Sequence, residues 1–258
     1  MKKLPLIFIL VVVAAFVSYF VSASGEKTIS VDTNVSVQAA QTQEHSESDH
    51  ILENTDTDVT DENGHDETQE HETQVYTAGK HYVVIDKPVE TVTGDKVEVR
   101  ELFWYYCGHC YNLEPYIHRM EATLTDDAEF VRQPAVFSER WEKGAVFYYV
   151  LTHLGELNRL HEPLFNAIHR DGIEFNSQED FVNWLDLNGV DLVKANDAFK
   201  QYSVAVNVNK AKVNSFKYQA QGVPTMVVNG KYWVDATHAG GIEEIFKVVD
   251  FLIEKESK

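Results

Sequence analysis

The chain contains two cysteines, and they stand three residues apart in the run Cys107-Gly108-His109-Cys110. Across the first turn of a helix, this spacing brings them to a separation that a disulfide tolerates. A cysteine at a helix N-terminus is favoured as a thiolate, because free backbone N–H groups and the helix dipole stabilise negative charge there. His109 can add a positive charge or a hydrogen bond that lowers the pKa further. The run therefore predicts redox chemistry in which Cys107 is a good leaving group and the oxidised pair passes its disulfide on.

Three other interpretations of the cysteine pair are weaker. A structural disulfide that closes so small a loop would stabilise little, since the entropic gain grows with loop length. A structural zinc site needs four ligands, and no second Cys or His pair stands at ligand spacing; His118, eight residues past Cys110, is alone. Two inert core cysteines would not explain the strand and helix that flank the pair. The sequence thus favours a redox-active pair that needs no metal and no other cofactor.

The elements around the motif alternate between strand and helix. Residues 97–106 alternate at first and are then continuously apolar, which is typical of a central strand covered on both faces. Residues 111–124 follow with helical spacing of their apolar side chains. Residues 82–86 predict a short strand, and residues 129–137 predict a second central strand. The motif is therefore expected where a buried strand ends and a helix begins.

The remaining globular part predicts helices, a hairpin and a final helix. Residues 139–218 have helical patterning throughout, interrupted by glycines at three points. Strand signals return at residues 226–228 and 231–234, and the Asn-Gly pair between them favours a type I′ turn. Residues 242–255 predict a helix with one apolar face. The order is that of an α/β fold with a helical insertion.

A second motif, Gly222-Val223-Pro224-Thr225, stands just before the predicted hairpin. The proline could simply start a strand. Opposite a cysteine pair, it predicts a cis-proline loop that exposes the backbone of Val223 to an extended substrate peptide. The aromatic residues 103–106 are expected to belong to the strand core rather than to the substrate surface.

The charge of the chain is concentrated in one segment. Over 258 residues the formal charge is −19, but residues 24–79 hold fourteen acids against the single Lys27, a net of −13. Residues 80–258 carry 27 acids and 19 bases, a net of −8. This balance argues against nucleic acid as a partner, since phosphate binding needs a clustered basic surface.

The N-terminus predicts export. Lys2 and Lys3 precede an apolar run at residues 4–21, which just reaches the length that spans a bilayer. Small residues at 21–23 resemble a cleavage site. The apolar run is therefore either a cleaved signal peptide or a retained membrane anchor. In both cases the lysines keep the start in the cytoplasm and the body of the chain is exported.

Residues 24–75 are expected to form a disordered acidic linker, because they cannot bury enough apolar surface to offset their ordering entropy. A linker of this charge would repel itself and extend. It contains four histidines among carboxylates, without a recognised ligand spacing: His45, His50, His65 and His71.

With these residues in view, the chain resembles the DsbA family of periplasmic thiol:disulfide oxidoreductases. The resemblance covers about 180 residues, from Gly79 to the C-terminus. It is carried by residues 82–89, 101–114, 163–165 and 222–232. It implies a thioredoxin-like fold with an inserted all-helical domain, and clients that are unfolded exported proteins with thiols. It also implies a DsbB-like, quinone-linked membrane oxidase as a partner.

The resemblance also implies roles for individual residues. Cys107 would be the nucleophile and Cys110 the buried resolving cysteine. Val223 and Pro224 would be the cis-proline pair that binds substrate. In this family, disulfides are donated to exported proteins in the periplasm, so the expected enzyme is a dithiol oxidase, either soluble there or tethered to the inner membrane.

Two carboxylates complete the expected site. Glu101 and Glu114 occupy the positions of buried acids that assist proton transfer in the family; otherwise Glu114 would be a solvated helix residue and Glu101 a carboxylate at a strand edge. The chain departs from the family at Gly108, where DsbA enzymes commonly have proline. The Gly-His dipeptide is typical of eukaryotic protein disulfide isomerases, and the long acidic linker is a second departure.

Two alternative functions stay open at this point. The protein could be a disulfide isomerase or reductase, as the Gly-His dipeptide suggests, or a membrane-tethered metal-binding module that uses the thiol pair and the linker histidines. The expected organisation is an export segment (1–23), a linker (24–75), a first thioredoxin-like part (76–138), a helical insertion (139–218) and a second thioredoxin-like part (219–258).

Overall fold

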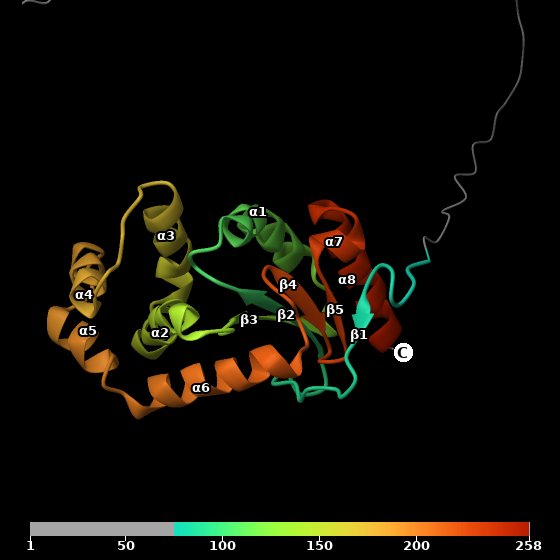
Figure 1. The fold of residues 1–258 in the computed structure, drawn as a ribbon, viewed down its shortest axis with the longest axis horizontal. Helices are drawn as coiled ribbons and strands as arrows, with labels where there is room; N and C mark the ends of the chain where they lie inside the picture. The colour runs from blue at the N-terminus through green and yellow to red at the C-terminus, as the bar shows by residue number, and fades with distance from the viewer. Residues whose placement is uncertain (1–74, 258) are drawn as a thin grey trace, which may run out of the picture. The chain divides into compact units, whose positions relative to one another are not determined.

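A computed structural model describes residues 75–257 of the chain. The predicted export segment and the linker up to residue 74 lie outside the described residues. Among residues 75–257, no helix combines the length and the apolar character needed to cross a bilayer. The described part is built on one five-stranded sheet with the order β1-β5-β4-β2-β3 (Figure 1). Its strands are β1 (Val83–Val84), β2 (Val97–Phe103), β3 (Ala128–Pro134), β4 (Thr225–Val228) and β5 (Tyr232–Val234).

The strand before the cysteine motif, β2, is buried along its whole length. It pairs in parallel with β3 and antiparallel with β4, and this register puts Glu101 beside Arg132. The predicted strand was too long: β2 ends at Phe103, because the apolar residues 104–106 form a turn into the next helix. The prediction that residues 129–137 form a central strand is also wrong, since β3 lies at the edge of the sheet.

The helices divide into those that cover the sheet and those that form the insertion. Helices α1, α7 and α8 lie against the sheet, whereas α2 to α6 lie between β3 and β4 in the sequence (Figure 1). The helices are α1 (Gly108–Thr123), α2 (Glu139–Leu154), α3 (Leu157–His169), α4 (Gln178–Leu187), α5 (Leu192–Ala198), α6 (Tyr202–Lys217), α7 (Ala236–Ala239) and α8 (Ile242–Glu256). The short α7 has no counterpart among the predicted elements.

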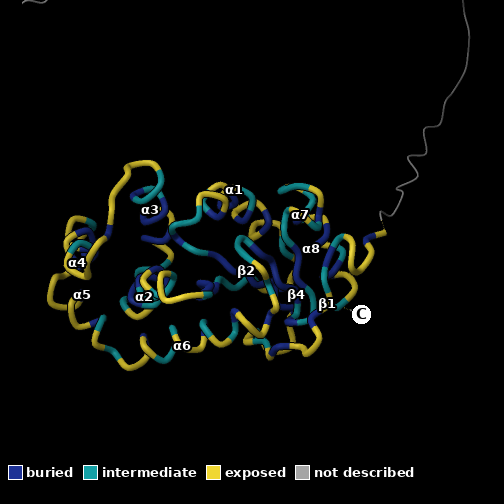
Figure 2. Tube along the Cα trace, in the orientation of Figure 1, coloured by how far each residue is buried: buried dark blue, intermediate teal, exposed yellow. Residues whose placement is uncertain are grey.

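The core is built from apolar side chains on both faces of the sheet and inside the insertion. On one face, the inward sides of α1 and α8 pack on β2 and β4. A separate aromatic and aliphatic cluster fills the helical insertion and reaches Phe103, Tyr105 and Cys110. Figure 2 shows buried residues along β2 and β4 and exposed ones along the outer helices. The sheet and the insertion therefore meet at the cysteine motif.

Two glycines confirm predicted chain reversals. Gly155 ends α2 in the left-handed conformation, with a φ of 72°. Asn229 and Gly230 have φ values of 49° and 62°, which is the backbone that a type I′ hairpin turn requires between β4 and β5. Gly230 also leaves no room for a side chain, since a Cβ there would overlap the carbonyl oxygen of Val89.

Candidate active site

Cys107 is the residue that caps the N-terminus of α1. Its backbone is extended, with φ −97° and ψ 112°, and helical geometry starts at Gly108. The N–H of Cys107 donates to the carbonyl of Trp104 at 2.9 Å, which closes the turn out of β2. The side chain is half-buried, and the two residues that follow it, Gly108 and His109, are exposed. The predicted placement of the motif at a strand-to-helix junction is confirmed.

The pKa of the Cys107 thiol falls from its ordinary value of 9.0 to about 6. The largest cause is a hydrogen bond from the Cys110 thiol to the Cys107 sulfur. The backbone N–H groups of Cys110 and His109 and the charge of His109 lower this pKa further, against the opposing effect of partial burial. At neutral pH, Cys107 is therefore mostly a thiolate, the form in which a thiol acts as nucleophile or leaving group.

Cys110 has the opposite electrostatic environment, although it lies only one turn further along α1. Its side chain is fully buried. Burial raises the pKa of Cys110 well above its ordinary value, and the hydrogen bond to Cys107 and the Cys107 charge raise it further. Cys110 therefore stays protonated, and a proton must reach or leave it whenever the disulfide opens or closes.

The second predicted motif lies against the cysteines. The peptide bond between Val223 and Pro224 is cis, as the sequence predicted. The Cys107 sulfur lies 3.6 Å from the carbonyl oxygen of Val223. Two motifs 116 residues apart in the sequence thus meet at one sulfur atom.

A surface groove of about 490 Å³ continues from this contact. It is lined by His109, by the cis-proline loop and by apolar side chains at the start of α8, including Ile242 and Ile245. Its position beside the half-buried Cys107 leaves space for an extended polypeptide next to the reactive sulfur.

The two predicted acids lie beneath the motif, and both are buried. Glu101 is 0% exposed and Glu114 3% exposed, so neither is a solvated residue. Arg132 stands between them: its Nε lies 3.6 Å from a Glu101 oxygen, and its Nη2 lies 3.2 Å from a Glu114 oxygen. The parallel register of β2 and β3 brings this arginine to the acids.

The two acids have opposite pKa shifts. Burial raises the pKa of Glu101 well above its ordinary value, and the Glu114 charge adds to the rise while Arg132 opposes it. Burial also acts to raise the pKa of Glu114, but the hydrogen bond from His161 and the charge of the Arg132 guanidinium outweigh it and lower this pKa. The pair therefore holds one proton on Glu101 and one negative charge on Glu114.

Three residues of this cluster were not anticipated from the sequence: Arg132, His161 and Tyr105. They come from β3, from α3 and from the turn after β2. A usable signal existed only for Arg132, because aligning residues 97–103 with residues 128–134 as parallel strands puts it opposite Glu101.

Two further expectations concern the aromatic residues and metals. Phe103 and Tyr105 are buried core residues, whereas Trp104 and Tyr106 are only partly buried. Within residues 75–257, no three His, Cys, Asp or Glu side chains are grouped in a way that would hold a metal ion. The linker histidines of the metal-binding alternative lie outside the described residues.

The sequence of the chain is similar to a family of known proteins and to individual members of it. The family profile described as DSBA-like thioredoxin domain matches residues 98–247. The thiol:disulfide interchange protein DsbA of Pseudomonas aeruginosa PAO1 is 41% identical over 181 residues, which is 70% of this chain and 86% of that protein. The protein of the same name from Azotobacter vinelandii is 38% identical over 178 residues, or 69% of this chain and 83% of that protein.

The fold matches solved structures of such proteins. The crystal structure of Pseudomonas aeruginosa DsbA superposes with a TM-score of 0.67 at 41% identity and covers 70% of this chain and 95% of that chain. The crystal structure of the oxidoreductase DsbA from Xylella fastidiosa gives a TM-score of 0.67 at 28% identity, with 71% and 99% covered.

Proposed function

The chain belongs to the DsbA family of thiol:disulfide oxidoreductases, and we propose that Cys107 is the nucleophilic and Cys110 the resolving cysteine of its redox centre. The fold is thioredoxin-like with a helical insertion, and the enzyme is a dithiol oxidase that forms disulfides in exported proteins. The observation that carries the residue assignment is the pKa contrast along one helical turn. Cys107 is stabilised as a thiolate at the accessible helix end, and Cys110 is held as a buried thiol.

The proposed reaction starts from the oxidised pair. A client thiolate attacks the Cys107 sulfur, the Cys107–Cys110 bond breaks, and its electron pair stays on Cys110. Glu101 passes its proton to the Cys110 thiolate, so that the mixed disulfide is not reversed by that thiolate. A second client thiolate then attacks the client sulfur of the mixed disulfide and displaces the Cys107 thiolate. The client is released with a new disulfide, and the enzyme keeps the two electrons as a reduced cysteine pair.

The cis-proline loop is proposed to hold the client during this exchange. The Val223 carbonyl faces the Cys107 sulfur, and backbone groups beside it can pair with an extended client segment, as in other strand-addition complexes. His109 and the apolar wall of the adjoining groove would contact the residues next to the client cysteine. The exposed Gly108 gives the client backbone unhindered access, because no atom lies within 4 Å of a Cβ built there.

The catalytic cycle needs a source of oxidising equivalents. We propose a DsbB-like, quinone-linked membrane oxidase, which would accept the two electrons through the same sulfur atom of Cys107. The apolar run at residues 4–21 would export the chain and place the enzyme in the periplasm, by signal cleavage or as a tether. Fractionating cells that make the full chain, and sizing the protein in each fraction, tests this location.

The residue assignment is tested with a matched pair of serine variants. Cys107→Ser should abolish oxidation of a reduced client, whereas Cys110→Ser should accumulate mixed disulfides through Cys107. Turnover by the Cys107 variant would refute the assignment. Direction is tested separately by the reduction potential: a value near that of thioredoxin, about −270 mV, would contradict an oxidase.

A further inference from the structure

The helical insertion contributes one buried polar residue to the acid cluster, His161 of α3. This side chain is 6% exposed. Its Nδ1 lies 2.7 Å from the Tyr105 hydroxyl, and its Nε2 lies 3.4 Å from a Glu114 oxygen. His161 therefore bridges the segment after β2 and helix α1, which carry the cysteine motif between them.

The charges around His161 decide which ring nitrogen carries the proton. The charged and titratable groups that face it are Glu114 and His118 from α1, Arg132 from β3, Tyr148 from α2, and Tyr105. Burial lowers the pKa of His161, so the ring is neutral. Since the ionised Glu114 can only accept, Nε2 carries the hydrogen and donates to it, and Nδ1 accepts from the Tyr105 hydroxyl. Both ring nitrogens are thereby used.

The hydrogen bonds of the two acids differ in one decisive respect. Glu114 accepts from His161 and Arg132. Neither oxygen of Glu101 has a hydrogen-bond partner among the described residues, because the Arg132 Nε stands 3.6 Å away and makes no hydrogen bond. A charge without donors in a buried site is costly, so the shared proton belongs on the acid that lacks them. His161 donates to only one member of the pair and so biases where the proton resides.

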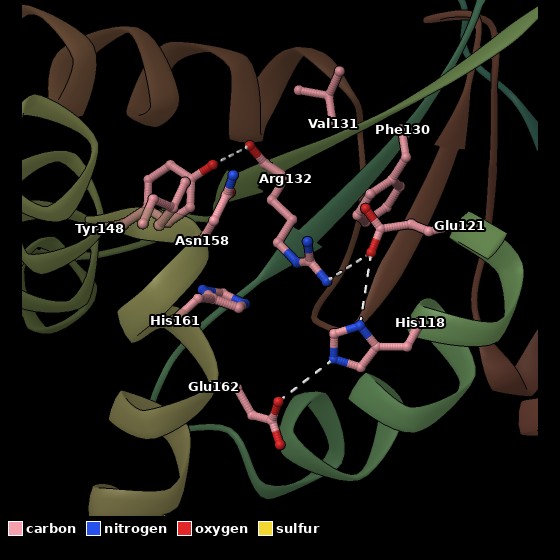
Figure 3. Close-up of a pocket in the computed structure, with 10 residues that line it drawn as sticks. His118, Glu121, Phe130, Val131, Arg132, Tyr148, Asn158, His161 and Glu162 are labelled. Carbon is pink, nitrogen blue, oxygen red and sulfur yellow. Dashed lines mark hydrogen bonds and ion pairs between the residues drawn. The ribbon is translucent and has the colours of Figure 1, made fainter. Parts of the chain in front are cut away.

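A water-accessible cavity reaches this cluster from the side of the insertion. It has a volume of about 510 Å³ and lies between α1 and α3. Figure 3 shows His118 and Glu121 of α1, His161 and Glu162 of α3, and Arg132 lining it. Glu101 itself is fully buried, so this cavity offers its cluster a polar route to solvent.

We propose that His161 is a positioning residue that keeps the single proton of the Glu101–Glu114 pair on Glu101, and that the cavity between α1 and α3 is where this pair exchanges protons with water. The inference rests on the proposed proton transfer from Glu101. When the disulfide opens, the proton moves from the Glu101 carboxyl to the Cys110 sulfur, and the pair regains one proton from water in the cavity. On reoxidation, Cys110 returns a proton to Glu101 and the pair releases one.

The test uses two substitutions of His161. In His161→Leu, Glu114 loses a donor, so part of the shared proton moves to Glu114. The rate at which the oxidised enzyme forms a mixed disulfide with a thiol peptide should fall about tenfold at pH 7, which is the effect of losing one hydrogen bond to a charged group. His161→Gln retains an amide donor and should restore most of the rate. The deficit should shrink at pH values low enough to protonate Glu114 as well as Glu101, because the position of a single shared proton then no longer matters.

A spectroscopic measurement on the same proteins reports the proton directly. The infrared carbonyl band of the protonated carboxyl should disappear with Glu101→Gln in the parent enzyme. In His161→Leu, part of it should persist when Glu101→Gln is added. The matched control is His169→Gln on the same helix, whose ring bonds the Tyr105 carbonyl oxygen; its rate and band should equal those of the parent.

Three outcomes separate the proposals. A Glu101→Gln enzyme with an unchanged rate would refute the role of the acids itself. A slowed Glu101→Gln enzyme combined with a normal His161→Leu enzyme would overturn only the inference about His161. An equal, pH-independent loss in the Leu and Gln variants would also overturn it, because it would indicate a purely structural role. If the Leu variant does not fold, it is replaced by Tyr105→Phe, which removes the donor to Nδ1. This variant should show a smaller loss of rate, with the same dependence on pH.

Discussion

The low pKa of Cys107 should make the stability of the reduced protein depend on pH in a way that the oxidised protein does not share. The folded-state pKa is about 6 and the ordinary value is 9.0. A thiol whose pKa is lowered by folding stabilises the native state fully above the unfolded pKa, and this contribution is lost as the pH falls through the folded pKa. Cys110 is a thiol throughout this window, because its pKa is raised.

The size of the effect follows from this difference. A shift from 9.0 to about 6 corresponds to about 4 kcal/mol at high pH, and about 2.6 kcal/mol of this develops between pH 5 and pH 8. Because Cys107 is partly exposed, solvent screening reduces the latter figure, and we expect about 1–2 kcal/mol. The reduced enzyme should gain this amount of unfolding free energy, relative to the oxidised enzyme, between the two pH values.

The assay is guanidinium unfolding of both redox forms at about pH 5 and about pH 8, with the difference between the forms taken at each pH. Acids that titrate alike in both forms cancel in this difference. Ultraviolet absorbance of the thiolate gives the Cys107 pKa independently, and Cys107→Ser provides the control that should remove the slope. A difference that stays constant across this range, or a slope that survives in Cys107→Ser, would refute the electrostatic argument.

Three other substitutions test the fold around the site. Arg132→Met leaves the buried acids without their cation and should cost about 3–5 kcal/mol of unfolding free energy at neutral pH, and less at acidic pH, where the carboxyls are protonated; denaturant unfolding at two pH values measures this. Gly108→Pro places proline at the first helical position, where no atom obstructs it, and should stabilise both redox forms by about 0.4–1 kcal/mol. A variant with the same thermal stability as the parent would contradict this expectation. Gly230→Ala would force a Cβ against the carbonyl of Val89 and should lower the free energy of unfolding by more than about 1 kcal/mol, which thermal unfolding would detect.

Local patterns were sufficient for the parts of the fold that local chemistry determines. The Asn229-Gly230 pair predicted its hairpin because few residues adopt two successive positive φ values. The final helix was predicted at residues 242–255 and is found at Ile242–Glu256, because its apolar face is regular. The motif at Cys107 was placed correctly for the same reason, since a strand pattern stops and a helical pattern starts there.

The errors and omissions arose where tertiary contacts decide. The predicted strand includes residues 104–106 because they are apolar, whereas the chain turns there and packs them against the insertion. The edge position of β3 cannot be predicted from its own residues, because the sequence of one strand does not show which strands pair with it. His161 carries no signal in the sequence, since it is one polar residue on an amphipathic helix, and only the docking of α3 on α1 gives it a partner 47 residues away. The boundaries assigned to the thioredoxin-like parts and the insertion stay predictions.

The asymmetry of the site has a simple origin in one helix. At its first turn, α1 presents free N–H groups to Cys107, and one turn later it points Cys110 into the cluster shared by the sheet and the insertion. Attack is therefore directed to the accessible sulfur, and a proton is demanded at the other one, where water is excluded. A fold that buries the resolving cysteine must bring a proton to it through the protein. In the proposed mechanism, the acid pair beneath α1 meets that need, and the helical insertion, by packing His161 against Glu114, takes part in the chemistry as well as in covering the site.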